Sequence, residues 1–193
     1  MALSFDPDDV DPEDRPPLWA ALQGRNLKKA WQLLRAGGSL DDVIEPDGST
    51  FLHAAVQDQD REMIEFFLDH GCPLPLESFD EVAHTPLMWA AEEGQLENAE
   101  MLLAAGANPN AHDEARAGNT ALREAVQGGH RKMVQLLLSH SGDPAIPGWM
   151  GISAVDQADI EIAGGLNSRR AERIRKLLKD YPRPLRDPAT GNG

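Results

Sequence analysis

The sequence predicts an all-α protein made of about five copies of a helix–turn–helix unit. A short word rich in Leu and Ala returns five times, and its final Ala stands at positions 21, 55, 90, 125 and 158. The steps between these alanines are 34, 35, 35 and 33 residues. A nearly constant long period of this kind indicates a repeat architecture. In such a stack each unit buries its apolar surface only against its neighbours.

The Leu- and Ala-rich words mark the first helix of each unit. They occupy residues 18–21, 52–55, 87–90, 122–125 and 155–158. Thr50 and Thr85 stand just before two of these words, and Pro86 follows the second Thr. A Thr side chain can accept an amide hydrogen bond at a helix N-terminus, and Pro is tolerated in the first turn. We therefore expect the first helices to begin directly after these threonines.

A second apolar run follows each word and marks the second helix. These runs cover residues 31–34, 64–68, 101–103, 134–138 and 174–178. Gly37, Gly71 and Gly106 stand three residues after the last Leu of three runs. A helix often ends on a residue with left-handed backbone, which Gly adopts without steric cost. Each unit is therefore expected to end its second helix at this position.

The repeated unit resembles the ankyrin repeat. Residues 85–91, 94–97 and 102–110 together read as nearly a complete repeat of that family, and residues 50–55 and 129–138 carry most of two more. The resemblance covers about residues 16–180 and implies an ankyrin-repeat solenoid with hairpin loops between its helix pairs. The units at both ends depart from the pattern, which is expected of capping units that face water. The resemblance also implies that His53 and Thr50 form a hydrogen-bonded pair that links neighbouring units.

The expected organisation is one repeat domain between two tails. Its units are placed at about 16–47, 48–82, 83–117, 118–150 and 151–180. Residues 1–15 are expected to form a flexible acidic tail, because six acids and two prolines fall between positions 6 and 14. Residues 181–193 are expected to form a C-terminal tail.

Charge is unevenly distributed along the chain. The formal net charge is −14; residues 1–167 carry 29 Asp and Glu against 10 Lys and Arg, whereas residues 168–193 carry 8 bases against 3 acids. An acidic surface argues against direct binding of nucleic acid or of an anionic membrane, since both require a cationic footprint. It favours a basic protein partner with fast, electrostatically steered association. An alternative is that the acidity only keeps the protein in solution.

Several features place the protein in the cytoplasm and argue against catalysis. The N-terminus lacks the basic and apolar regions of a secretory signal, no segment reaches the length of a membrane span, and Cys72 is the single cysteine. The six histidines are scattered without metal-ligand spacing, and phosphate-binding loops and nucleophile elbows are absent from the sequence. We expect no catalytic residues, no metal and no cofactor.

The resemblance implies a binding surface on the concave face of the solenoid, formed by hairpin tips and the exposed ends of the first helices. The candidate partner-binding residues are Asp47, Asp58, Glu81, Glu92, Glu93, Arg116, Asn119, Gln127, Trp149 and Met150. Trp149 and Met150 have the composition of an interface anchor. In the competing interpretation Trp149 packs beneath the last unit. Trp19, Trp31 and Trp89 are expected in the core.

The predicted function is recognition of another protein through this acidic concave face. The resemblance implies a role as an inhibitor, an adaptor or a bacterial immunity protein. The acidic charge predicts a basic partner, and a toxin or an enzyme fits. The chain itself is expected to be monomeric. Two alternatives remain open: a nucleic-acid mimic that regulates a DNA-binding protein, and a structural scaffold.

Overall fold

The protein is all-α over the residues that the computed structural model describes, which are 17–38, 48–69, 76–116, 118–165 and 168–181. These ranges contain ten α-helices and one short 3-10 helix, and no strand. The predicted all-α ankyrin-repeat fold is confirmed. The acidic tail 1–15, Asp47, Gly71, Cys72 and all of the C-terminal tail except Tyr181 lie outside the described residues.

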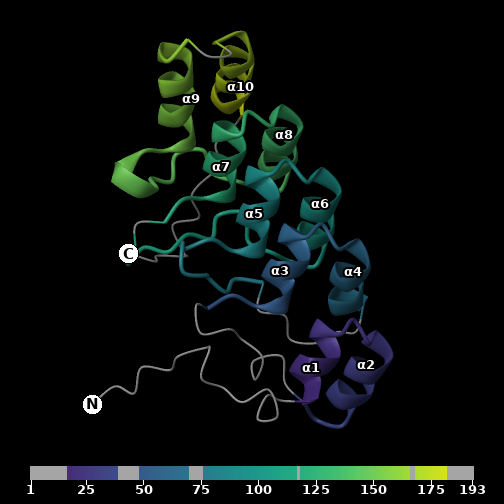
Figure 1. Cartoon of the computed structure of the whole chain (residues 1–193). Coiled ribbons are helices and arrows are strands. Elements are labelled where there is room, and N and C mark those ends of the chain that lie inside the picture. Colours follow the sequence, from purple (N-terminus) through teal and green to yellow (C-terminus); the bar gives the residue numbers. More distant parts are fainter. Residues whose placement is uncertain (1–16, 39–47, 70–75, 117, 166–167, 182–193) are drawn as a thin grey trace, which may run out of the picture. The chain divides into compact units, whose positions relative to one another are not determined.

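The chain divides into two compact units. Unit one comprises residues 1–90 and 97–108, and unit two comprises residues 91–96 and 109–193. The helices of unit one are α1 (Pro17–Gln23), α2 (Leu27–Arg35), α3 (Phe51–Gln57) and α4 (Arg61–Asp69). Within this unit α1 packs on α2 and α3 packs on α4 (Figure 1). Two further helices, α5 (Pro86–Glu92) and α6 (Leu96–Ala104), contribute residues to both units.

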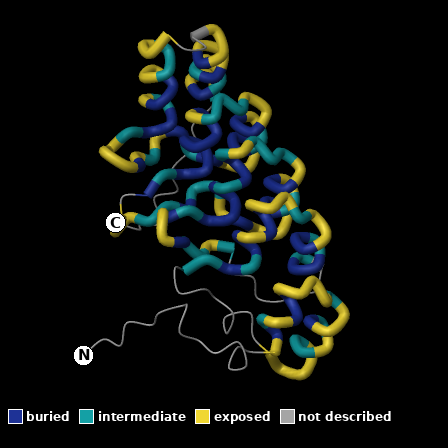
Figure 2. The backbone as a smooth tube through the Cα atoms, in the orientation of Figure 1, coloured by how far each residue is buried: buried dark blue, intermediate teal, exposed yellow. Residues whose placement is uncertain are grey.

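Unit two contains α7 (Ala121–Gln127), α8 (Arg131–Ser139), α9 (Ala154–Ala163) and α10 (Ser168–Asp180), with the 3-10 helix η3 (Trp149–Gly151) before α9. Its helix α7 packs against α8 and α9, and α10 packs against α8 and α9. Because α7 has neighbours on two sides, it is buried along almost its entire length (Figure 2). Every Leu- and Ala-rich word and every second apolar run falls inside a helix, as the sequence predicts.

Four of the first helices begin directly after a hydroxyl side chain, as predicted for Thr50 and Thr85. Thr50, Thr85 and Thr120 each accept a hydrogen bond from the backbone N–H three residues later, at 3.3 to 3.4 Å. Ser153 does the same before α9, and the Asp156 carboxylate accepts the N–H of Ser153 in return at 2.9 Å. These contacts satisfy amides that have no partner inside the helix.

His53 links two successive repeats within unit one, as the family resemblance implies. Its Nδ1 accepts the backbone N–H of Thr50 at 3.1 Å, so its Nε2 carries the proton and donates to the carbonyl of His84 at 3.1 Å. The imidazole is fully buried. The His53 side chain therefore caps the N-terminus of α3 and connects it to the hairpin of the next repeat.

The turn between the two helices of a repeat requires left-handed backbone. The residue at this turn is Arg25, Gln59, Gly94, Gly129 and Gly165 in successive repeats, with φ between +53° and +74°. Gly37 and Gly106, at the predicted helix ends, have φ of +100°. The prediction for these two glycines is confirmed, and Ser141 takes the same conformation at φ +66° without being Gly.

The core consists of Ala, branched aliphatic, Met and Phe side chains, and the tryptophans lie only partly in it. Leu22, Val56, Ile64 and Phe67 are buried in unit one, and Leu122, Met133, Val134 and Leu137 are buried in unit two. The expectation that Trp19, Trp31 and Trp89 are core residues is wrong in part, because all three are half-buried. The layer between two short helices is thin, so a large indole ring extends from it to the surface.

Candidate functional site

The most exposed apolar side chains of the described residues lie in one turn of unit two. Trp149 is 59% exposed and Met150 is 71% exposed. We call residues 149–151, which form η3, the apolar turn. The competing interpretation, in which Trp149 packs beneath the last repeat, is wrong: Ala154, Ala158, Ile174 and Leu178 fill the interior there and leave the indole outside.

The apolar turn is fixed by backbone hydrogen bonds. The N–H of Gly148 donates to the carbonyl of Ile152 at 3.0 Å, and the N–H of Ile152 donates to the carbonyl of Trp149 at 3.2 Å. Met150 has φ +59°, a left-handed conformation that costs a side-chain-bearing residue roughly 1–2 kcal/mol. Residues held in such conformations cluster at functional sites. The turn therefore presents Trp149 and Met150 in a defined arrangement.

Asn119 positions this turn from the preceding hairpin. Its Oδ1 accepts the N–H of Trp149 at 3.1 Å, and its Nδ2 donates to the carboxylate of Glu124 on α7. A Cβ atom at Gly148 would lie 2.8 Å from Oδ1 of Asn119, so only Gly allows this approach. Both ends of the Asn119 amide are thus used inside the protein, which suits a positioning role beside Trp149.

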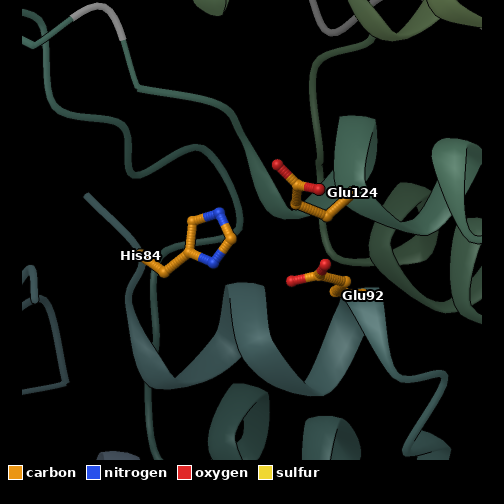
Figure 3. A group of neighbouring side chains, drawn as sticks. All are labelled: His84, Glu92 and Glu124. Carbon is orange, nitrogen blue, oxygen red and sulfur yellow. The ribbon is translucent and has the colours of Figure 1, made fainter. Parts of the chain in front are cut away.

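Glu124 is a residue that the sequence analysis missed. It is 3% exposed, and its carboxylate lies next to that of Glu92 at the end of α5, with oxygens within 4.8 Å of each other (Figure 3). Glu124 occupies the third place of the Leu- and Ala-rich word, which Ala holds in the first two repeats. A charged residue at a place normally filled by Ala was the available signal. The structure brings Glu92 and Glu124 together in unit two.

The remaining candidates of unit two lie at the surface. Glu93 and Gln127 are exposed at the ends of α5 and α7, and Glu92 beside them is half-buried. Arg116 is exposed and forms an ion pair with Asp113 in the same loop. The hydrogen bonds from Arg116 lower the pKa of the Asp113 carboxyl. The Arg116 charge is therefore largely balanced within its own loop.

In unit one the candidates Asp58 and Glu81 are both exposed. Glu81 belongs to a hairpin that is organised by Asp80. Asp80 is another residue that could not be picked out from the sequence. The Asp80 carboxylate is buried and accepts the N–H groups of Val82 and His84 at 3.1 and 2.9 Å and the indole N–H of Trp89 at 2.7 Å. His84 lies before α5 (Figure 3), and its ring stands edge-on to Trp89 at 5.0 Å. This hairpin tip is therefore rigid.

A buried cation lies at the contact between α7 and α9. Arg123 is 5% exposed, and its Nη2 donates to Oε1 of Gln157 at 3.2 Å. Burial lowers the pKa of its guanidinium, since desolvation penalises the charged form. This cation has no access to a partner molecule, so its role is internal to unit two.

No helix in the described part of the chain is both long and apolar enough to cross a bilayer.

Comparisons with known proteins agree with the repeats seen in the structure. Residues 17–113 match the profile described as "Ankyrin repeats (3 copies)", and residues 117–149 match the profile described as "Ankyrin repeat". The chain is 34% identical over 113 residues to a "Putative ankyrin repeat-containing protein" of Treponema pallidum (strain Nichols), which covers 58% of this chain and 37% of that protein.

Two further relatives are much longer proteins. The human "Transient receptor potential cation channel subfamily A member 1" is 30% identical over 142 residues, covering 73% of this chain and 12% of the channel. The rat "ARF GTPase-activating protein GIT2" is 35% identical over 98 residues, covering 51% of this chain and 12% of that protein. The chain thus spans little more than a third of these relatives at most. The shared region consists of the repeats, and the chain belongs to the ankyrin-repeat family.

Proposed function

We propose that this ankyrin-repeat protein binds a basic protein and acts as its inhibitor, immunity protein or adaptor. Ankyrin repeats in general mediate protein–protein interaction, and the repeats of this chain are of that kind. The observation that carries the proposal is the apolar turn, where Trp149 and Met150 are exposed on a backbone that hydrogen bonds hold in place. In this proposal the protein works in the cytoplasm by binding alone, with no catalytic step.

The apolar turn supports binding because its anchor is organised before the partner arrives. A few central side chains carry most of the energy of an interface, and Trp is enriched among them. Ordering a flexible loop on binding costs free energy, which a fixed turn avoids. Asn119 contributes by holding the N–H of Trp149, so we assign it a positioning role in place of a direct contact.

The preference for a basic partner follows from the exposed acids. Glu93 and Glu114 are exposed in unit two, as are Asp58 and Glu81 in unit one. Exposed carboxylates accelerate the approach of a cationic protein and fix its orientation more than they add affinity. We therefore propose that the acids steer the partner and that Trp149 and Met150 hold it. Gln127, exposed at the end of α7 in unit two, is a further contact residue in this proposal.

The proposal is tested by capturing proteins from the native lysate on wild-type protein and on the Trp149→Ala/Met150→Ser variant in parallel. A matched control is Ile160→Ser, which removes another exposed apolar side chain of unit two, on α9. A partner retained by the wild type and by the control, and lost by the double variant, supports the anchor. Its affinity is then measured by calorimetry, where Trp149→Ala should weaken binding by about 30-fold, the effect of a typical hot spot.

The steering role has a separate test. Glu93→Lys should slow association with the identified partner and reduce its dependence on salt, while dissociation changes little. Equal association rates for Glu93→Lys and wild type would rule out the acidic surface as the steering element. Equal affinity of Trp149→Ala and wild type would overturn the anchor.

A further inference from the structure

The last helix, α10, carries a surface of opposite charge to the rest of unit two. It contains six Lys and Arg against Glu172 and Asp180, whereas residues 91–96 and 109–167 of the same unit contain nine acids and four bases. Ala171, Ile174 and Leu178 are buried on one side of α10. At 100° per residue, Arg169, Arg173 and Lys176 lie on the opposite, outward side, with the exposed Asp180 one turn beyond Lys176 at the end of the helix. We call these three residues the basic face.

The basic face is not neutralised by the chain's own described acids. Arg169, Arg173 and Lys176 are exposed, and among the described residues none of them forms an ion pair. Two neighbouring bases contact other parts of the protein. Arg175 forms an ion pair with Asp159. Arg170 lies against the turn at Gly129, where a Cβ added to the glycine would lie 2.8 Å from Nε of Arg170. The protein therefore uses two of the six bases for its own packing and leaves three on the outward side, while the sixth, Lys179, is exposed in the last turn of α10.

The bases at the start of α10 work against its stability. Its first turn contains no acid but holds Arg169 and Arg170, next to the positive end of the helix dipole. Acids are favoured there, and a cation near this end destabilises the helix. A capping helix selected for stability alone would show the reverse arrangement. Local choices that oppose stability are expected where a sequence serves a function.

We propose that the basic face of α10 is a second docking site, which binds an unstructured acidic segment of another protein. Arg169 and Lys176 are separated by about 10 Å along the helix axis. Alternate carboxylates of an extended peptide are spaced about 7 Å apart, so three of them span about 13 Å and can meet all three bases. The site is independent of the apolar turn and of the partner proposed for it. Together the two sites make the protein an adaptor between a basic and an acidic partner.

An acidic peptide fits this face better than nucleic acid or a membrane does. The helix is about 20 Å long, and electrostatic screening in physiological salt acts over about 8 Å. A short peptide stays within this distance of the bases. A nucleic acid or lipid surface extends beyond the helix, and the rest of unit two carries nine acids against four bases. Repulsion there disfavours both.

The test measures fluorescence anisotropy of a labelled five-residue peptide of alternating glutamate and serine with the full-length protein. We expect saturable binding at about 50 mM salt that weakens about tenfold at about 300 mM. Arg169→Glu/Arg173→Glu should weaken binding at least about tenfold, because two attractive contacts become repulsive. The matched control is Lys28→Glu/Lys29→Glu, which reverses two exposed bases in the first turn of α2 in unit one and should leave binding unchanged.

Two further measurements make the result decisive. The thermal midpoint of Arg169→Glu/Arg173→Glu should equal or exceed that of the wild type, which excludes unfolding as the cause of lost binding. A thymidine oligonucleotide of equal charge and vesicles containing phosphatidylserine should bind more weakly than the peptide. The proposal is overturned if either binds more tightly, if the peptide does not bind, or if the two double variants bind it equally. Trp149→Ala should retain peptide binding, so this proposal and the apolar anchor fail separately.

Discussion

Gln59→Gly should stabilise the protein. Gln59 occupies the turn between α3 and α4 with φ +56°, where the equivalent residues of later repeats are Gly94 and Gly129. A residue with a side chain loses roughly 1–2 kcal/mol in this conformation, whereas Gly adopts it freely. Gly also has more conformational freedom than Gln in the unfolded chain, and this favours the unfolded state by about 0.5–1 kcal/mol. The expected net stabilisation is about 0.5–1 kcal/mol.

Gln59 is a clean site for this measurement because its side chain is exposed and takes part in no hydrogen bond within the described residues. Its backbone N–H bonds to Val56 and its carbonyl bonds to the N–H of Arg61, and Gly preserves both. Arg25 has the same conformation in the first repeat but pairs with Asp60 at 2.8 Å, so its replacement would mix two effects.

Urea denaturation followed by circular dichroism gives the stability difference, and the thermal midpoint should rise by about 1–4 °C. Gln57→Gly is the matched control: the same substitution two residues earlier, at an exposed position inside α3 with right-handed helical backbone. It should lower stability by about 0.5–1 kcal/mol. If both substitutions shift stability in the same direction, the assignment of strain to the left-handed turn is refuted.

Three other predictions use thermal or urea denaturation. Gly94→Ala should lower the stability of the protein by more than roughly 1–2 kcal/mol, which is the cost of left-handed backbone alone. The added Cβ would also lie 2.4 Å from the ring of His130. An unchanged thermal midpoint would contradict this packing. Arg123→Met should leave stability unchanged or raise it by about 1 kcal/mol, since it removes buried guanidinium N–H groups that have no partner among the described residues. A large loss of stability would show that the hydrogen bond to Gln157 dominates. Hydrogen bonds from Ser153 lower the pKa of Asp156, so its contribution is present above about pH 4 and is lost as pH falls through the folded-state pKa. The stability difference between wild type and Asp156→Asn should therefore disappear in acid, and a pH-independent difference would contradict the assignment.

The helices could be predicted from the sequence because each of their signals is local. The Leu- and Ala-rich words predict the first helix of each repeat, and Thr50 and Thr85 predict where α3 and α5 begin. The bond from His53 to the next repeat was also available, through the family resemblance. Periodicity therefore determined most of the fold of each repeat.

The site was less predictable because its geometry depends on contacts between distant residues. Asn119 is separated from Trp149 by 30 positions, and only the folded hairpin shows that its amide holds this turn. The burial of Glu124 likewise depends on how α7 packs, although its place in the repeated word was unusual. Spacing alone could identify Trp149 as a candidate but could not decide whether it faces inward or outward.

The contact between His53 and the next repeat has a consequence for how this sequence can change over time. His53 bonds to Thr50 in its own repeat, whereas its bond to the next repeat is made to the backbone carbonyl of residue 84. Substitutions at 50 and 53 are therefore expected to arise together among relatives, whereas residue 84 can vary without breaking this link. The hairpin tip can thus acquire new recognition chemistry while the joint between repeats is inherited intact.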